Sequence, residues 1–319
     1  MKTLVYGAGN IGSLYAALLK DSGQNVAILS RGRRLDRIRQ HGIELENAVT
    51  RKKTSTPIDT VERLDPDEAY DLVLVILPKH LISEVLPILA ANRRTPNVMF
   101  MVNNAAGPGE MVDALGKDRV LLGFPGAAGV ADDHIIQYLI TSAREQPTTM
   151  GEVDGKTSPR IKAIAKIFQA SGFPASICSN MDAWLKTHVA EILPTVGALY
   201  MVEGDLHRLA CNRDALTLLV RAIREGYQVL RENRIPITPA SHKLFGWLPI
   251  RMLLALMKRM IESDTTKTKV GHALEGRAEW RLLADEFRSL ATTTDVPTPA
   301  MDRLYQHIDS TAGTTKGDK

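Results

Sequence analysis

The sequence predicts two domains, a Rossmann-like doubly wound α/β domain followed by an all-α domain. Short runs rich in Val, Leu and Ile alternate with helical patterns over roughly the first 125 residues, as in βαβ units. Several of these runs are continuous rather than alternating, which is typical of parallel strands covered on both faces. From about Ser158 onward, apolar residues instead recur at spacings of three and four, the period of amphipathic helices.

The predicted elements set the domain boundaries. The predicted strands are the apolar runs 3–6, 25–30, 71–77, 97–102 and 120–124, and the clearest helical patterns between them are 11–21 and 81–91. We place the boundary near Ser179, so that residues 1–178 form the Rossmann-like domain and residues 179–310 the helical domain. Residues 311–319 are Thr, Ala, Gly, Lys and Asp without apolar periodicity, which predicts a disordered tail.

Composition narrows the class of partner. The net charge of +4 is modest for 319 residues and is not concentrated in runs, which argues against nucleic acid as a partner. Only two cysteines occur, without CxxC spacing, and the N-terminus lacks the regions of a signal peptide. The apolar stretch 247–260 is interrupted by charges and is shorter than the ~20 residues a membrane span needs. We therefore expect a cytoplasmic protein with a small-molecule partner, no membrane partner and no metal.

A glycine motif follows the first predicted strand directly. Gly7, Ala8, Gly9, Asn10, Ile11 and Gly12 form a complete GxGxxG that opens the first helical pattern. In this context the first glycine permits a tight turn, the second lets a pyrophosphate approach the backbone, and the third lets helix and strand pack closely. The amino end of the helix adds free N–H donors for phosphate oxygens. The motif therefore predicts a dinucleotide site.

The end of the second predicted strand indicates which dinucleotide is bound. NAD enzymes usually carry Asp or Glu there to hold a ribose hydroxyl, whereas this strand ends in Ser30 and Arg31. A guanidinium makes paired charge-assisted hydrogen bonds to a phosphate. We therefore predict NADP(H), with Arg31 as the recognition residue. Arg33 and Arg34 are left open between the same role and simple solvation.

Further segments resemble the ketopantoate reductase family. Residues 71–79 resemble its strand segment ending in a lysine, here Lys79, and residues 102–107 resemble its Gln-Asn-Gly motif, here with Asn104. Residues 182–186 are similar to its Trp-x-Lys motif, and Glu279 and residues 297–299 match its C-terminal Thr-Glu and Pro-Thr-Pro signatures. Together these segments cover nearly the whole chain in the family's order.

The resemblance implies roles for individual residues. Lys186 corresponds to the catalytic lysine, which gives a proton to the substrate carbonyl while the cofactor gives a hydride. Asn104 borders cofactor and substrate, and Lys79 lies near the nicotinamide ribose. For Glu279 we weigh an orienting role against that of a solvated helix carboxylate.

The sequence departs from the family where the substrate is held. Two asparagines that follow the family's lysine by four and eight residues are here Ala190 and Pro194, and the glycine after the motif Asn is Ala105. Alanine and proline side chains cannot form the asparagine hydrogen bonds. We therefore expect a related reaction on a different, more apolar substrate. His272 is a candidate substrate contact, because it lies seven residues before Glu279 and is able to share its helix face.

The sequence thus predicts an NADPH-dependent reductase of a 2-oxo acid or related carbonyl compound. The alternatives are an opine-type dehydrogenase, which joins a 2-oxo acid to an amine, and a non-catalytic NADP-binding sensor. The methionine-rich segment 247–260 is expected to be core, with a homodimer contact or a substrate lid left open. The physiological substrate and the direction of flux are not indicated.

Overall fold

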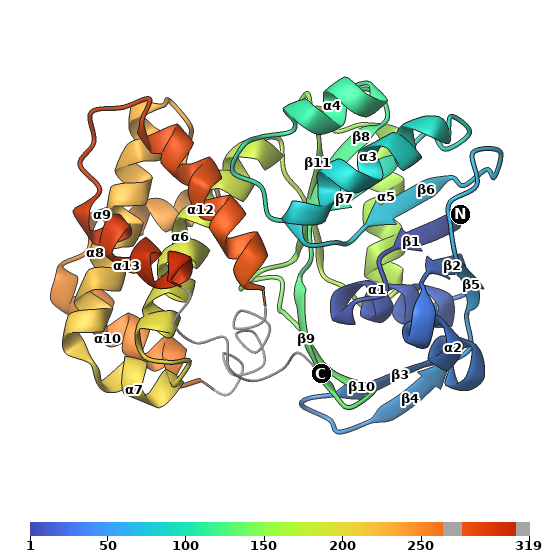
Figure 1. Cartoon of the computed structure of the whole chain (residues 1–319), viewed down its shortest axis with the longest axis horizontal. Coiled ribbons are helices and arrows are strands. Elements are labelled where there is room, and N and C mark those ends of the chain that lie inside the picture. The colour runs from blue at the N-terminus through green and yellow to red at the C-terminus, as the bar shows by residue number, and fades with distance from the viewer. Residues whose placement is uncertain (264–275, 311–319) are drawn as a thin grey trace. The chain divides into compact units, whose positions relative to one another are not determined.

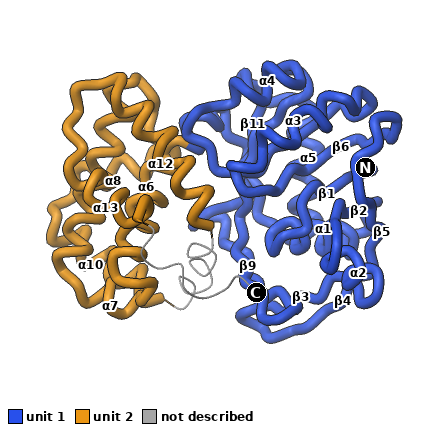
Figure 2. Tube along the Cα trace, in the orientation of Figure 1, with its two compact units in different colours: residues 1–185 blue, residues 186–319 orange. Residues whose placement is uncertain are grey.

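The computed structural model of the protein describes residues 1–263 and 276–310. The chain divides into two compact units, Met1–Leu185 and Lys186–Lys319, drawn in blue and orange in Figure 2. Helix α6 (Met181–Met201) carries the chain from the first unit into the second. The boundary expected near Ser179 falls just before this helix. The tail 311–319 lies outside the described residues.

Unit 1 is built on an eight-stranded sheet with the order β12-β11-β8-β7-β6-β1-β2-β5 (Figure 1). Neighbouring strands are parallel except for the antiparallel pair β8 and β11. The strands are β1 Lys2–Tyr6, β2 Asn25–Leu29, β5 Asp59–Val61, β6 Leu72–Val75, β7 Val98–Met101, β8 Val120–Phe124, β11 Thr148–Glu152 and β12 Ala175–Ile177. The five predicted strands are the five adjacent strands from β8 to β2. The predicted Rossmann-like sheet is therefore confirmed.

Helices cover both faces of this sheet. Successive residues of β1 point to opposite sides, so that Val5 belongs to one core while Leu4 and Tyr6 belong to another. Helices α1 (Asn10–Asp21) and α5 (Pro159–Ala170) contribute to the first core, and α3 (Ile82–Ala91) and α4 (Gly109–Leu115) to the second. Because water reaches neither face, β6 and β7 are buried along their whole length. This burial explains their continuous apolar sequences.

A second, four-stranded sheet has the order β4-β3-β10-β9. Its strands are β3 Ile43–Asn47, β4 Lys53–Thr56, β9 Ala127–Asp132 and β10 Ile135–Ile140. This sheet was not predicted from the sequence, nor were β5, β11 and β12. Polar residues alternate with apolar ones in β3, and β9 begins with Ala and Gly, so these strands lack the continuous apolar runs used to find the others. The second sheet lies beside the first helix, since β9 and β10 contact α1.

Every regular element described in unit 2 is helical, which confirms the predicted all-α domain. The helices are α6, α7 Leu206–Cys211, α8 Arg213–Glu232, α9 Leu244–Trp247, α10 Ile250–Ile261, α12 Arg277–Ala291 and α13 Pro299–Asp309, with a 3₁₀ turn η2 at Ala240–Lys243. Helix α8 contacts α10, α12 and α13. A strongly one-sided apolar pattern, with Leu216, Leu219 and Tyr227 among its buried residues, suits this central place.

Helix α13 is anchored at its amino end. The carboxylate of Glu225 on α8 accepts hydrogen bonds from the backbone N–H groups of Ala300 at 2.9 Å and Met301 at 2.8 Å. Those N–H groups belong to the first turn of α13, where the helix itself offers no acceptor. The Pro-Thr-Pro signature at 297–299 therefore leads into a helix whose start is capped by a side chain of α8. This contact gives the signature a structural role.

The methionine-rich segment is only partly core. In α10, Leu253, Met257 and Ile261 are buried, whereas Met252 and Leu256 are exposed. Across residues 1–263 and 276–310, none of the helices combines the length and the apolar content that crossing a membrane requires.

Candidate functional site

The glycine motif forms a tight turn between β1 and α1. Gly7 has a φ of +124°, and a Cβ there would lie 2.3 Å from the backbone oxygen of Ile76, so no other residue fits. A Cβ on Gly12 would lie 2.0 Å from the backbone oxygen of Gly7. A Cβ on Gly9, in contrast, would meet no atom within 4 Å. Gly7 and Gly12 are therefore required by the fold, whereas the space over Gly9 is open, as a bound pyrophosphate needs.

The amino end of α1 is suited to an anion. Its N-cap residue, Gly9, makes no side-chain capping bond, and its first turn carries no acidic residue. The Asn10 side chain is directed to the backbone oxygen of Gly129 in β9, at 3.4 Å. The first-turn N–H groups thus have no carboxylate or hydroxyl cap, and the helix dipole favours negative charge at the same point.

A cavity of about 350 Å³ opens beside this turn. Its walls are Gly7 and Ala8, the end of β2 with the first turn of α2 (Gly32–His41), and the segment from Leu77 into α3. Each of these segments follows the carboxyl end of a parallel strand, which is where ligands bind in open α/β sheets. The cavity is therefore the continuation of the predicted dinucleotide site.

Two residues of the cavity wall carry buried polar atoms without partners. These atoms are Oγ of Ser30 and Nε of Arg34. Another nitrogen of Arg34 donates to Ser13 Oγ at 3.1 Å, which ties the guanidinium to the first turn of α1. Burial lowers the pKa of Arg34, Arg37 nearby lowers it further, and Glu44 opposes them. A partly buried cation of this kind is stabilised by an anion brought into the cavity.

The three arginines after β2 are not equivalent. Arg31 lines the cavity and is fixed by a bond from its Nε to the backbone oxygen of Glu62 at 3.1 Å. Arg34 lines the same cavity, whereas Arg33 is exposed and is not part of the wall. The two arginines left open by the sequence therefore differ in position, because Arg34 lines the cavity and Arg33 does not. Ser30 was not singled out as a site residue, although its place at the strand end marks it.

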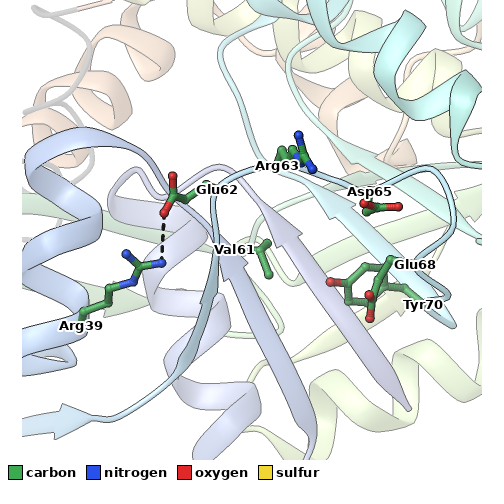
Figure 3. Close-up of a pocket in the computed structure, with 7 residues that line it drawn as sticks. All are labelled: Arg39, Val61, Glu62, Arg63, Asp65, Glu68 and Tyr70. Carbon is green, nitrogen blue, oxygen red and sulfur yellow. Dashed lines mark hydrogen bonds and ion pairs between the residues drawn. The ribbon is translucent and has the colours of Figure 1, made fainter.

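A second concavity, of about 460 Å³, lies next to the edge strand β5 and is drawn in Figure 3. In that view the Arg39 guanidinium points at the Glu62 carboxylate, with which it forms an ion pair at 3.1 Å. The Glu68 carboxylate is paired with Lys2. Because the concavity contains no part of the glycine turn and three of its charged residues are already paired, we do not consider it the cofactor site.

Two predicted residues near the site make strong contacts within unit 1. Lys79, in the 3₁₀ turn η1 (Lys79–Leu81), is 5% exposed and forms an ion pair with Glu110 in the first turn of α4. Asn104 is also buried, and its side chain bonds Gly107 twice, donating to the oxygen at 2.8 Å and accepting from the N–H at 3.1 Å. The Asn104 amide thus shapes the loop after β7, as asparagine side chains commonly do in turns.

Lys186 lies near the start of α6 and is 9% exposed. Two residues earlier, the ring of Trp184 packs against Phe124 at the end of β8, with 5.1 Å between ring centroids. Trp184 and Leu185 belong to the core of unit 1, and Lys186 is the first residue of unit 2. The tryptophan of the Trp-x-Lys motif therefore fixes the helical turn that precedes the lysine.

The positions of the two missing asparagines are part of the helical core. Ala190 is fully buried, and a Cβ on Gly226 of α8 would lie 3.1 Å from its side chain. Pro194 is buried inside α6 and has no N–H to give to the backbone oxygen of Ala190. Neither position offers a side-chain donor or acceptor.

Two predicted residues remain, Glu279 and His272. Glu279 is half-buried in the first turn of α12. His272 lies outside the described residues. The residues assigned to catalysis are thus divided between the units, with Asn104 in unit 1 and Lys186 and Glu279 in unit 2.

Comparisons with known proteins agree with this architecture. A 2-dehydropantoate 2-reductase of Aquifex aeolicus is 28% identical over 243 residues, covering 74% of this chain and 74% of that protein. The solved 2-dehydropantoate 2-reductase of Geobacter metallireducens has a TM-score of 0.78 at 15% identity, covering 96% of this chain and 98% of that one. A D-mandelate dehydrogenase solved with NADH and anilino(oxo)acetate has a TM-score of 0.76 at 14% identity, with 97% of both chains covered.

Residues 3–155 match the family model described as "Ketopantoate reductase PanE/ApbA". This range contains the glycine turn, both arginines of the cavity wall, Lys79 and Asn104. Residues 3–155 are therefore similar to the ketopantoate reductase family, whose members are pyridine-nucleotide-dependent oxidoreductases.

Proposed function

We propose that the protein is an NADP(H)-dependent reductase of a 2-oxo acid or a related carbonyl compound. The observation that carries the choice of cofactor is the cavity in which Arg31, Arg34 and Ser30 meet beside the glycine turn. A ribose phosphate brings two negative charges and several acceptor oxygens, which suit two guanidinium groups and a hydroxyl. The carboxylate that would favour NAD is missing from the end of β2.

The proposed reaction turns a carbonyl into an alcohol. Bound nicotinamide supplies a hydride to the carbonyl carbon. Lys186 gives a proton from its Nζ to the carbonyl oxygen and is left as a neutral amine, which takes up a proton from solvent afterwards. The low exposure of Lys186, 9%, supports this role because bulk water then competes little for the same proton. We propose that Asn104 contributes by fixing the loop after β7 rather than by donating to the substrate.

The substrate is proposed to be more apolar than the family pattern implies. Ala190 and Pro194 stand where the family has two asparagines, and both are buried without side-chain hydrogen-bonding groups. A site that lacks these groups gives up the hydrogen bonds on which strong discrimination for a hydroxylated substrate depends. We therefore propose a 2-oxo acid with an aliphatic or aromatic side chain.

The test is NADPH consumption by the purified full-length chain over a panel of 2-oxo acids that includes ketopantoate and phenyl-substituted acids, with and without added amines. We expect turnover without an amine, and its loss in Lys186→Ala with NADPH affinity retained. Lys162→Ala, an exposed lysine of α5, is the matched control and should leave turnover unchanged. An amine requirement would identify an opine-type dehydrogenase instead. Tight NADPH binding without turnover on the whole panel would identify a sensor.

A further inference from the structure

A carboxylate in unit 2 is shared by two donors from different elements. Glu191 on α6 accepts a hydrogen bond from the Tyr227 hydroxyl of α8, and its Oε1 lies 2.5 Å from Nδ1 of His242 in η2. Tyr227 is 1% exposed, whereas the side chains of Glu191 and His242 are 26% and 38% exposed. The cluster therefore reaches from the core of the unit to its surface.

The same face of α6 is bound a second time, one turn earlier. The hydroxyl of Thr187 accepts from the backbone N–H of Thr238 at 3.1 Å. Thr187 and Glu191 are four residues apart and thus share a helix face. Thr187 binds Thr238, just before η2, and Glu191 binds His242 within η2. Thr187 directly follows Lys186 in the sequence. The helical turns that begin at Lys186 are therefore joined at two points to the stretch that begins at Thr238.

The far end of the stretch is bound to α8. Arg224 donates from Nε to the backbone oxygen of Phe245 at 3.3 Å, and from its terminal nitrogen to that of Leu248. We call residues 238–248 the clasp segment. Its amino end is held by α6 and its carboxyl end by α8, and of these contacts only the one through His242 depends on a group that titrates near neutral pH.

We propose that Glu191 is a positioning residue for Lys186. Bonded to Tyr227 and to protonated His242, Glu191 fixes the part of α6 from Lys186 to Glu191 against the clasp segment. Deprotonation of His242 loosens this part of the helix. The role assigned to Lys186 rests on the proposed function. The contact between Glu191 and the clasp segment does not.

The charges around His242 give the direction of the pH dependence. Glu191 faces it from α6, Tyr227 from α8 and Lys243 from its own turn, while the nearby arginines of α8, Arg224 and Arg231, donate to backbone oxygens. The hydrogen bond to Glu191 raises the pKa of His242, and burial only partly opposes this. Because the pKa of His242 is raised in the folded protein, the contact stabilises the fold fully at pH values below the ordinary histidine pKa. This stabilisation is lost as the pH rises through the raised pKa.

Tyr227 does not titrate in the same range. Burial, together with the neighbouring Glu191, raises the pKa of its hydroxyl far above the ordinary value. The hydroxyl therefore stays a donor at every pH at which the protein is studied. Loss of the contact at high pH is consequently a property of His242.

Hydrogen exchange of the full-length protein tests the contact without reference to activity. After correction for intrinsic exchange, we expect protection of residues 238–248 and 187–192 to fall as the pH rises above the ordinary histidine pKa, in step with the His242 titration followed by NMR. His242→Gln keeps a neutral donor and should abolish this pH dependence, whereas His207→Gln, an exposed histidine of α7, should retain it. Protection in the parent protein that does not vary with pH, as in His242→Gln, overturns the proposal.

Turnover then tests the positioning role. We expect kcat to fall at high pH with the apparent pKa found for His242, and Glu191→Gln to lower kcat between about tenfold and a hundredfold without changing the affinity for NADPH. Glu191→Asp, with its carboxylate kept, should recover part of the loss. A pH-dependent contact with an unaffected kcat overturns the positioning role but leaves the proposed function intact. Absence of turnover on every substrate overturns both, even where exchange shows the contact.

Discussion

A methyl group on Gly12 would lie 2.0 Å from the carbonyl oxygen of Gly7, so the turn closes only when both positions are glycine. We expect Gly12→Ala to push α1 away from β1, to abolish cofactor binding and to lower the free energy of unfolding by about 1–3 kcal/mol. Urea unfolding and NADPH titration measure the two effects. Unchanged values in both would contradict this account of the turn.

Gly9 provides a matched comparison on the same turn. A Cβ there meets no protein atom within 4 Å, so Gly9→Ala should fold with the stability of the parent. The added methyl group occupies the space that a pyrophosphate needs, and we expect NADPH affinity to fall at least about tenfold. A parallel loss of stability would show that Gly9 serves the fold instead.

The preference for NADPH over NADH should depend on the two arginines of the cavity wall, Arg31 and Arg34. We expect Arg31→Ala and Arg34→Ala each to weaken NADPH binding by roughly tenfold to a hundredfold, because each removes a charge-assisted contact of about 1.5–3 kcal/mol. NADH binding should change little. Arg33→Ala is the control, since this neighbouring arginine is exposed and outside the wall. Equal Kd values for NADPH and NADH in the parent protein would refute the preference.

A partly buried ion pair between Glu152 and Arg160 joins β11 to the start of α5. Glu152 is 6% exposed and accepts from Arg160 Nε at 2.8 Å and from the Ser158 hydroxyl. Burial alone would raise the pKa of Glu152, but the bonds from Arg160 and Ser158 outweigh it and lower the pKa. With its pKa lowered in the folded protein, the Glu152 carboxylate stabilises the fold at pH values above the ordinary carboxyl pKa. This stabilisation is lost as the pH falls through the lowered pKa.

We therefore expect Arg160→Ala to lower stability at pH 7 by about 1–3 kcal/mol, and to do so less in acid, where Glu152 becomes protonated. Urea unfolding at both pH values makes the comparison. The exposed Arg94→Ala should show neither effect. A deficit of the same size at both pH values would mean that Arg160 stabilises by packing and not through the carboxylate.

Restoring the family's asparagine at position 190 should not restore its chemistry. Ala190 is packed against Gly226, which is already the smallest residue, so the larger polar side chain in Ala190→Asn has no room. We expect a loss of about 1–3 kcal/mol and no gain in activity on ketopantoate. Ala163→Asn, on the exposed face of α5, is the control for helix propensity. A stable, more active Ala190→Asn enzyme would show that helices α6 and α8 separate easily at this point.

The parts of the fold that the sequence predicted are those with a strong physical signature. Strands buried on both faces, such as β6 and β7, must be apolar at every position, and GxGxxG after such a strand has few structural explanations. The second sheet has no such signature. In β3, Glu44 and Glu46 alternate with the apolar Ile43 and Leu45. Gly129 of β9 is chosen for its neighbours in space, including Asn10, more than one hundred residues away in the sequence.

In the candidate site, too, the sequence predicted the residues whose place depends on a local pattern and missed those that only the fold brings together. Arg31 was proposed from the sequence because its place depends only on the end of one strand. The place of Arg34 in the cavity wall depends on the rotation of α2 and on the contact with Ser13, which a one-dimensional pattern does not contain. The cluster of Glu191, Tyr227 and His242 brings together residues from three elements, and no spacing rule connects them.

Helix α6 has a practical consequence for anyone who divides this protein. Met181, Trp184 and Leu185 fill the core of the nucleotide-binding unit, although the helix to which they belong continues into the other unit. A fragment cut at residue 178 would lose three apolar side chains from its interior and become prone to aggregation. A shorter enzyme, or a chimera with a relative's helical half, has to be joined after Leu185, in the middle of a continuous helix.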